Sequence, residues 1–222
     1  MENEIPQEKE IATSMSKRTR LTLEVTGAAL FGAMSLVLSA FVTPIIPRIP
    51  GWGIAIIDPV SILWITCFLI FGVKSGLLCC IIGTLALFPF DPFTPIGPLM
   101  KLSATVSLII VPILLLRLYK TEPDLRNSQK YKKLSSYIFT GLLGIVLRII
   151  VMMIFNVWLF LTLFSGSLGG TTLEFIGLPS ITGWNALIIG VIIINAESSI
   201  WDLLLPYLVV YGLKLDQKYE IW

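Results

Sequence analysis

Residues 134–164 read LSSYIFTGLLGIVLRIIVMMIFNVWLFLTLF, an apolar run interrupted by a single charge at Arg148. The hydrocarbon core of a bilayer requires about 20 apolar residues per helix. This run exceeds that length, so it predicts a helix that crosses the membrane with a tilt or projects beyond it. The stretch decides the class of protein, because an apolar helix this long is not expected in a soluble fold.

The composition of the whole chain agrees with that reading. Of 222 residues, 55% are hydrophobic and 14% are charged, against roughly 25% charged in typical soluble domains. The mean hydropathy is +0.88. The net charge of +2 is too balanced for a nucleic-acid-binding protein, and the absence of histidine excludes His-based catalysis and His-ligated metal sites. The three cysteines lie inside apolar runs without zinc-site or disulfide spacing, so we expect buried thiols and no metal.

Further apolar segments complete a set of spans. The six expected spans are 21–42, 54–71, 73–88, 98–118, 134–164 and 181–213. The second and third are short and separated only by the glycine-bounded stretch GVKSG, which is typical of a tight helical hairpin. We therefore expect an all-α membrane protein with a cytoplasmic tail at 1–20, a six-helix transmembrane domain at 21–213 and a second cytoplasmic tail at 214–222.

The basic residues predict the orientation in the membrane, because cytoplasmic loops carry an excess of Lys and Arg. Basic residues precede span one, separate spans two and three, fill the loop between spans four and five, and follow span six. The loops on the other side carry only Arg48. We therefore predict a multi-pass protein of the plasma membrane with both termini in the cytoplasm (N-in/C-in).

The three loops on the outer side are apolar and rich in turn residues. They cover 43–53, 88–98 and 165–179, where Pro and Gly alternate with aromatic residues. An interfacial aromatic belt explains any single such residue. Three loops of this kind on one face favour a cap over a ligand pocket.

Ionisable residues at membrane depth are costly and indicate a structural or functional role. Counting 1.5 Å per residue places Arg148 and Glu197 at similar depths. We expect them to form an ion pair that locks spans five and six together, with Asp202, one to two turns nearer the cytoplasm, as the rival partner.

Four other polar residues are candidates for ligand contact. Lys101 begins span four at a depth similar to that of Asp58 and Asp91, so it snorkels, pairs with one of these carboxylates or contacts a polar ligand. Asn156 lies broadly on the same helix face as the arginine and offers both donors and an acceptor. Asn195 is explained equally well by an interhelical hydrogen bond. We predict a pocket in the outer half of the molecule on which the lysine and the two asparagines converge.

Span one carries small residues four positions apart, Ala28 with Gly32 and Ala29 with Ala33. Such pairs let two helix backbones approach closely in lipid. The pattern is explained by packing within the bundle or by docking of a partner helix, for which Ala29, Gly32 and Ala33 are the candidates.

No pattern of catalytic residues is found. The Lys-Ser pair between spans two and three lacks the spacing of a phosphate-binding loop, and there is neither G-x-S-x-G nor a dinucleotide-binding fingerprint. We expect no enzymatic activity and no cofactor, and we expect any ATP hydrolysis to belong to separate proteins.

Taken together, these features resemble the substrate-binding S component of energy-coupling factor vitamin transporters, over nearly the whole chain after residue 20. Within that group the sequence looks most like the riboflavin-type branch. Residues 58–63 (DPVSIL) and 71–76 (FGVKSG) are similar to its second and third spans. Arg148, Met152 and Asn156 match its Arg-x-x-x-Met-x-x-x-Asn pattern in the fifth span.

Two further segments carry the resemblance with departures. Residues 96–102 (IGPLMKL) are similar to the entrance of the fourth span, where Lys101 stands in place of the family's usual Asn. Asn195 aligns with the Asn of the sixth span, but Ser198 stands where the family has Lys.

The resemblance implies a function. The S components capture a vitamin from outside and dock on a transmembrane coupling subunit that two cytosolic ATPases drive. Ala29 and Ala33 match the family's Ala-x-x-x-Ala docking motif, and Asn156 and Asn195 are implied as ligand contacts. The implied ligand is riboflavin or a related flavin. The alternatives are a thiamine, biotin or queuosine-precursor type of ligand, or a non-transport membrane scaffold whose outer loops bind a protein or lipid.

Overall fold

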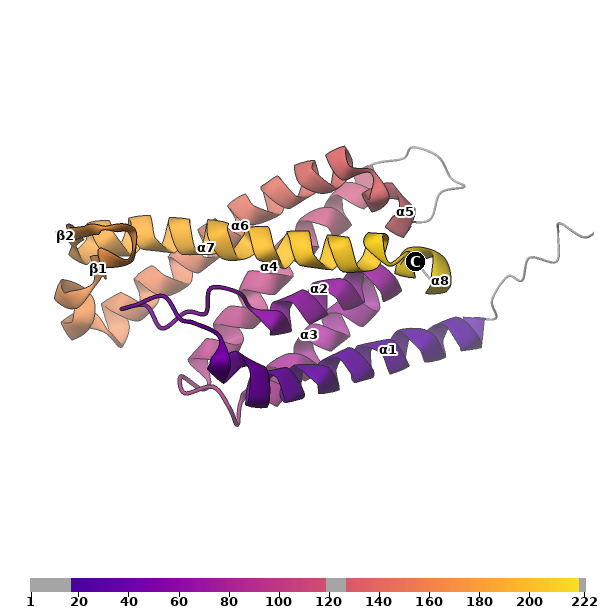
Figure 1. Cartoon of the computed structure of the whole chain (residues 1–222), viewed down its shortest axis with the longest axis horizontal. Coiled ribbons are helices and arrows are strands. Elements are labelled where there is room, and N and C mark those ends of the chain that lie inside the picture. Colours follow the sequence, from indigo (N-terminus) through magenta and orange to yellow (C-terminus); the bar gives the residue numbers. More distant parts are fainter. Residues whose placement is uncertain (1–16, 119–126, 220–222) are drawn as a thin grey trace, which may run out of the picture.

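Six substantial helices pack into one elongated bundle in a computed structural model that describes residues 17–118 and 127–219 (Figure 1). Their bounds are α1 (Lys17–Val37), α2 (Pro59–Phe71), α3 (Val73–Leu87), α4 (Ile96–Leu118), α6 (Leu134–Thr162) and α7 (Gly183–Tyr207). The minor elements are α5 (Asn127–Lys132), α8 (Leu215–Tyr219), and the antiparallel strands β1 (Thr172–Leu173) and β2 (Leu178–Thr182). One π-helical turn continues α1 over Leu38–Val42 and another continues α7 over Leu208–Gly212.

Four of the helical segments are long and apolar enough to cross a membrane. They are Arg18–Ile45, Ile96–Leu116, Leu134–Thr162 and Gly183–Gly212. The α2 and α3 helices have 13 and 15 residues, about 20 and 22 Å at 1.5 Å per residue. The prediction of an all-α multi-pass membrane protein with six main helices is confirmed. That α2 and α3 also cross the membrane stays a prediction.

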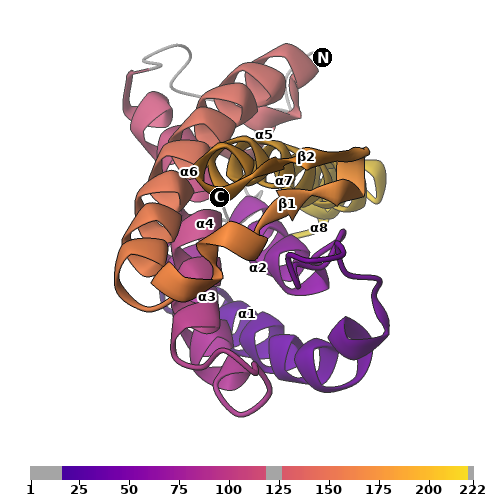
Figure 2. The same cartoon turned by 90° about the vertical axis from the view of Figure 1, so that its left-hand side faces the viewer.

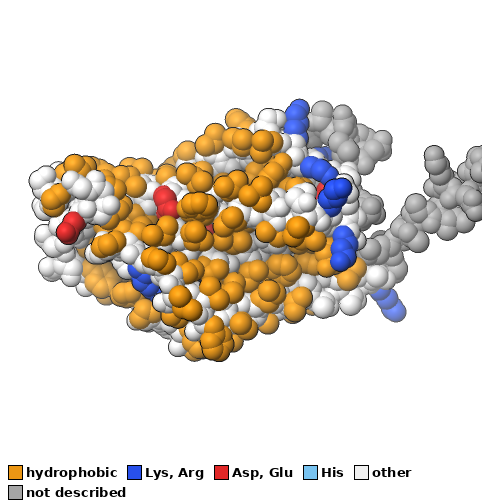
Figure 3. Space-filling model, in the orientation of Figure 1, with side chains coloured by type: hydrophobic (Ala, Val, Ile, Leu, Met, Phe, Trp, Pro, Cys, Tyr) orange, Lys and Arg blue, Asp and Glu red, His pale blue; other side chains and the backbone are white. Residues whose placement is uncertain are grey.

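The surface has the character that lipid requires. Hydrophobic side chains cover most of the face in Figure 3, whereas most Lys and Arg side chains in that view gather at one end. On α6, for example, Leu142, Ile154 and Leu161 are 57%, 65% and 62% exposed. We call the end with α5, α8 and the start of α1 the basic end. We call the opposite end, with β1, β2 and the loop 43–58, the hairpin end (Figure 2).

The α2 and α3 helices form the expected tight helical hairpin, which is not the β1–β2 hairpin that names the hairpin end. At the start of α2 the Asp58 carboxylate accepts a hydrogen bond from the Val60 backbone N–H at 3.1 Å and so caps the helix. A single residue, Gly72, separates the two helices, and its φ of 92° is a conformation that glycine adopts readily. The turn is therefore tighter than the five-residue stretch expected from the sequence.

The packing of α1, α2 and α3 centres on one buried indole. Trp64 of α2 is fully buried and donates from Nε1 to the Ser35 hydroxyl of α1 at 2.8 Å. Its ring lies against Gly83 of α3, where a Cβ would collide with it. A glycine in α3 thus lets the three helices share one large side chain.

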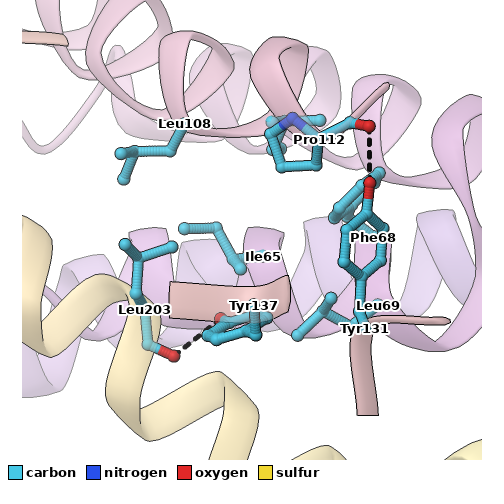
Figure 4. Close-up of a pocket in the computed structure, with 9 residues that line it drawn as sticks. Ile65, Phe68, Leu69, Leu108, Pro112, Tyr131, Tyr137 and Leu203 are labelled. Carbon is cyan, nitrogen blue, oxygen red and sulfur yellow. Dashed lines mark hydrogen bonds between the residues drawn. The ribbon is translucent and has the colours of Figure 1, made fainter. Parts of the chain in front are cut away.

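Tyrosines close the basic end. Tyr131 of α5 donates to the Pro112 carbonyl of α4, and Tyr137 of α6 donates to the Leu203 carbonyl of α7 (Figure 4). The void between these side chains is apolar and measures about 10 Å³, roughly the space for one water. This end is therefore packed core.

The segment expected as a cytoplasmic tail, 214–222, is helical over most of its described part. Residues Leu215–Tyr219 form α8. The Asp216 carboxylate, 1% exposed, pairs with Lys132 of α5 at 3.4 Å. Residues 220–222, and residues 1–16 of the expected N-terminal tail, lie outside the described part of the chain.

Candidate ligand-binding cavity

A cavity of about 450 Å³ lies in the half of the molecule toward the hairpin end. This volume falls within the range of small-molecule sites, roughly 300–1,000 Å³. Side chains of α4, α6 and α7 line it together with the N-terminus of α2 and two loops, 43–58 and 88–95. Lys101, Asp58, Asn156 and Asn195 all line this cavity. The structure thus brings together the four residues expected at a ligand site, and their role as ligand contacts stays a prediction.

Lys101 pairs with Asp58 across the cavity wall. The Nζ atom lies 2.9 Å from the Asp58 carboxylate, and the two side chains are only 20% and 17% exposed. Asp58 also accepts from the Ser61 hydroxyl at 2.7 Å. Of the two carboxylates left open by the sequence, Asp58 is the partner, because Asp91 turns back to accept from the Phe93 backbone N–H.

Arg148 lies half-way along α6 at the deep end of the cavity, with a side chain that is 9% exposed. Its Nη1 donates to Asp202 Oδ2 at 2.5 Å, and its Nε donates to Asn195 Oδ1 at 3.3 Å. The predicted pairing of Arg148 with Glu197 is wrong. Glu197 instead accepts from the Trp201 indole N–H at 2.7 Å.

The reason for this difference is the direction of side chains around α7. Asn195 and Asp202 are seven residues apart, about two turns, and so share one helix face. Glu197 is two residues from Asn195, which turns it about 200° away at 100° per residue. Counting residues gives the depth of a side chain along the membrane normal, but not its direction around the helix. The long arginine side chain spans a turn of depth, but it cannot reach around a helix.

The two asparagines are oriented by their own helices. Asn156 donates from Nδ2 to the Met152 carbonyl at 2.8 Å. Asn195 donates in the same way to the Val191 carbonyl at 2.8 Å, and its Oδ1 accepts from the arginine described above. Both amides therefore have a fixed orientation in the wall of the cavity.

Aromatic and sulfur-containing side chains supply much of the remaining wall, and of these the sequence analysis named only Met152, as part of the family pattern. The cavity-lining members are Trp52, Phe93, Met100, Met152, Phe160 and Phe164. They are flat or flexible apolar groups of the kind that line small-molecule sites. They come from the loops 43–58 and 88–95, from α4 and α6, and from the segment that follows α6, so no single local pattern in the sequence marks the group.

Trp52 fixes the first loop to the hairpin end. Its indole N–H donates to the Thr172 carbonyl of β1 at 3.1 Å. Its ring meets Phe175 edge-on at 6.0 Å, and it rests on α7 at Gly190, where a Cβ would collide with it. The flanking glycines at 51 and 53 have positive φ values of 77° and 65°. That Gly-Trp-Gly spacing is the one signal in the sequence that points to this contact.

The small residues of α1 divide between two faces. Ala29 and Ala33 are exposed, as a docking face requires. Gly32 is buried against Ile82 of α3, and Ala28 is fully buried. The grouping of Gly32 with the docking residues is therefore corrected: it serves the packing of α1 on α3.

Metal-ligating side chains and cysteines are the remaining groups of chemical interest in the described residues. Within 17–118 and 127–219 no three His, Cys, Asp or Glu side chains are grouped to hold a metal ion. The three cysteines are free and buried, as expected.

The fold and the cavity define an all-helical, multi-pass membrane protein with a ligand-sized cavity toward one end. Searches of protein-family models, curated proteins and solved structures return no match to this chain.

Proposed function

We propose that this protein is a solute-capture subunit of a membrane transport system, similar to the S components of energy-coupling factor transporters, and that a flavin, most simply riboflavin, occupies the cavity. The observation that carries the proposal is the cavity of about 450 Å³, in which Asp58, Lys101, Asn156 and Asn195 face aromatic walls. A few fixed polar groups among flat apolar side chains are typical of a site for a planar, polar small molecule.

The proposed orientation makes the cavity open outward. The clustering of Lys and Arg at the basic end supports a cytoplasmic location for that end. Both termini are then cytoplasmic and the hairpin end faces outside, where a subunit of the plasma membrane meets its solute.

The proposed energy source is external. The chain has no phosphate-binding loop, so two cytosolic ATPases and a transmembrane coupling subunit would drive release of the vitamin. The exposed pair Ala29 and Ala33 is the proposed contact with the coupling subunit, because small residues let a partner backbone approach. The proposal involves no catalysis, cofactor, metal or nucleic acid.

Equilibrium binding to the purified protein in detergent tests the proposal. We expect saturable binding of riboflavin and none of thiamine, biotin or a queuosine precursor. Asn156→Ala should weaken riboflavin binding, whereas the matched change Asn127→Ala in α5, at the basic end, should not. Binding of one of the other vitamins in place of riboflavin would make that vitamin the ligand instead of the flavin. Saturable binding of none of the four would favour a scaffold and overturn the proposal.

A further inference from the structure

The guanidinium of Arg148 has hydrogen-bonding capacity that its protein partners do not use. A guanidinium carries five N–H donors in a planar fork. The bonds to Asp202 and Asn195 use one N–H of Nη1 and that of Nε. Within 17–118 and 127–219 the group makes no other hydrogen bond, and its side chain lines the deep end of the cavity while only 9% exposed. The unused N–H groups of Arg148 therefore belong to a side chain that lines the cavity, where they can donate to an acceptor on a ligand.

The positive charge of Arg148, at the deep end of the cavity (the cavity floor), is already balanced by a carboxylate. Asp202, whose side chain is 0% exposed, neutralises Arg148. Lys101, a half-buried cation of the same cavity, is paired with Asp58. An anionic ligand group would have to displace a buried carboxylate, whereas a neutral carbonyl oxygen can accept from the remaining N–H groups without disturbing either pair.

The shape of the floor favours a ring. Asn195 holds Nε and Asp202 holds Nη1, so the plane of the fork is fixed from two sides. The sulfur-containing side chain of Met152, one helical turn along α6, lines the cavity near the arginine, and the aromatic ring of Phe160 lines it farther toward the hairpin end. A fixed planar fork at one end of a cavity whose farther wall is aromatic suits a flat ring system whose carbonyl oxygens project from its edge.

We propose that Arg148 contacts the ligand directly and donates to the carbonyl oxygens of a neutral, planar heterocycle on the cavity floor. The inference rests on the proposed function, and it gives the arginine a role beyond the ion pair between α6 and α7.

Replacing carbonyl oxygen by sulfur in the probe tests the contact. The probes are riboflavin, 2-thioriboflavin and 4-thioriboflavin, in which a thiocarbonyl is a poorer acceptor. Wild type should bind at least one thio probe about tenfold or more weakly than riboflavin, the size of one lost hydrogen bond to a charged group. Arg148→Lys keeps the charge beside Asp202 but removes the fork. It should lose affinity for riboflavin by about tenfold and bind the three probes alike.

The control is Asp202→Asn, which changes the same ion pair from outside the cavity and keeps an oxygen acceptor for the arginine. It should lower the thermal midpoint yet keep the wild-type preference for oxygen over sulfur. Equal binding of all three probes by wild type overturns the inference, even if Arg148→Lys does not fold. An unchanged preference in Arg148→Lys also overturns it. Failure of wild type to bind riboflavin or any other vitamin of the panel would instead overturn the proposed function.

Discussion

At the scale of single residues, Arg148 shows that the direction of a side chain around its helix decides its partner more than its depth in the membrane does. It reaches Asp202 and Asn195 because both lie on the face of α7 that is turned toward α6. Glu197, closer in depth, is turned away and bonds to Trp201. The ion pair is buried, with 9% and 0% exposure of the two side chains. A buried pair tolerates the loss of both charges better than the loss of one.

Arg148→Met should therefore strand the Asp202 carboxylate and destabilise the protein by about 3–5 kcal/mol. The double variant Arg148→Met with Asp202→Asn should recover part of that loss. Thermal unfolding in detergent, without ligand, measures both. Arg148→Met with Glu197→Gln is the matched control and should show no recovery. Equal recovery in the two double variants would mean that Asp202 is not the partner that matters.

At the scale of elements, the hairpin end is held together by contacts between segments that are distant in the sequence. The loop 43–58 is fixed to β1 through the Trp52 indole N–H and to α7 through the close approach at Gly190. The same loop supplies lining residues of the cavity. We therefore expect its attachment to the β1–β2 hairpin to control how closed the cavity is.

Trp52→Ala should loosen this attachment and make the cavity more accessible. In a Met100→Cys background, where the new thiol lines the cavity, a water-soluble maleimide should react at least several-fold faster after Trp52→Ala. Gly190→Ala should act in the same direction, because the added Cβ pushes the indole from its seat. The control Ile45→Ala changes a side chain that is 81% exposed on the same loop and should not alter the rate. An unchanged rate in both test variants would show that another contact closes the loop.

At the scale of the whole molecule, α1 has one face for the bundle and one for its surroundings. Ala28 and Gly32 pack inward, and the adjacent Ala29 and Ala33 point outward. The cavity lies on other helices. The outward alanines do not line the cavity, and under the proposed function they are the contact for a partner subunit.

The double variant Ala29→Leu with Ala33→Leu should bind riboflavin like wild type but fail in uptake by cells that supply the other subunits. Bulkier side chains keep a partner backbone at a distance and remove the close packing. Ala28→Leu is the inward control and should destabilise the isolated protein, because overfilling a packed site typically costs about 1–3 kcal/mol. Normal uptake by the double variant would exclude this docking face.

The prediction from sequence succeeded where the physical rule is local. The position of each main helix follows from hydropathy, and the hairpin between α2 and α3 follows from Gly72. Asp58, Lys101, Asn156 and Asn195 could be selected because a polar group at membrane depth needs a partner. Trp52 and Phe93 could not, since an aromatic residue in an outer loop looks the same whether it faces a cavity, the interface or a neighbouring loop.

The sequence by itself determined that the chain is a membrane protein with about six main helices, because the insertion of an apolar run into lipid depends on its length and composition. It also determined which polar residues demand an explanation. Only the tertiary structure decided that Lys101 meets Asp58, that Arg148 meets Asp202, and that Gly32 faces inward while Ala33 faces outward. Those choices depend on the rotation of each helix about its own axis, which is set by how large and small side chains fit between neighbouring helices.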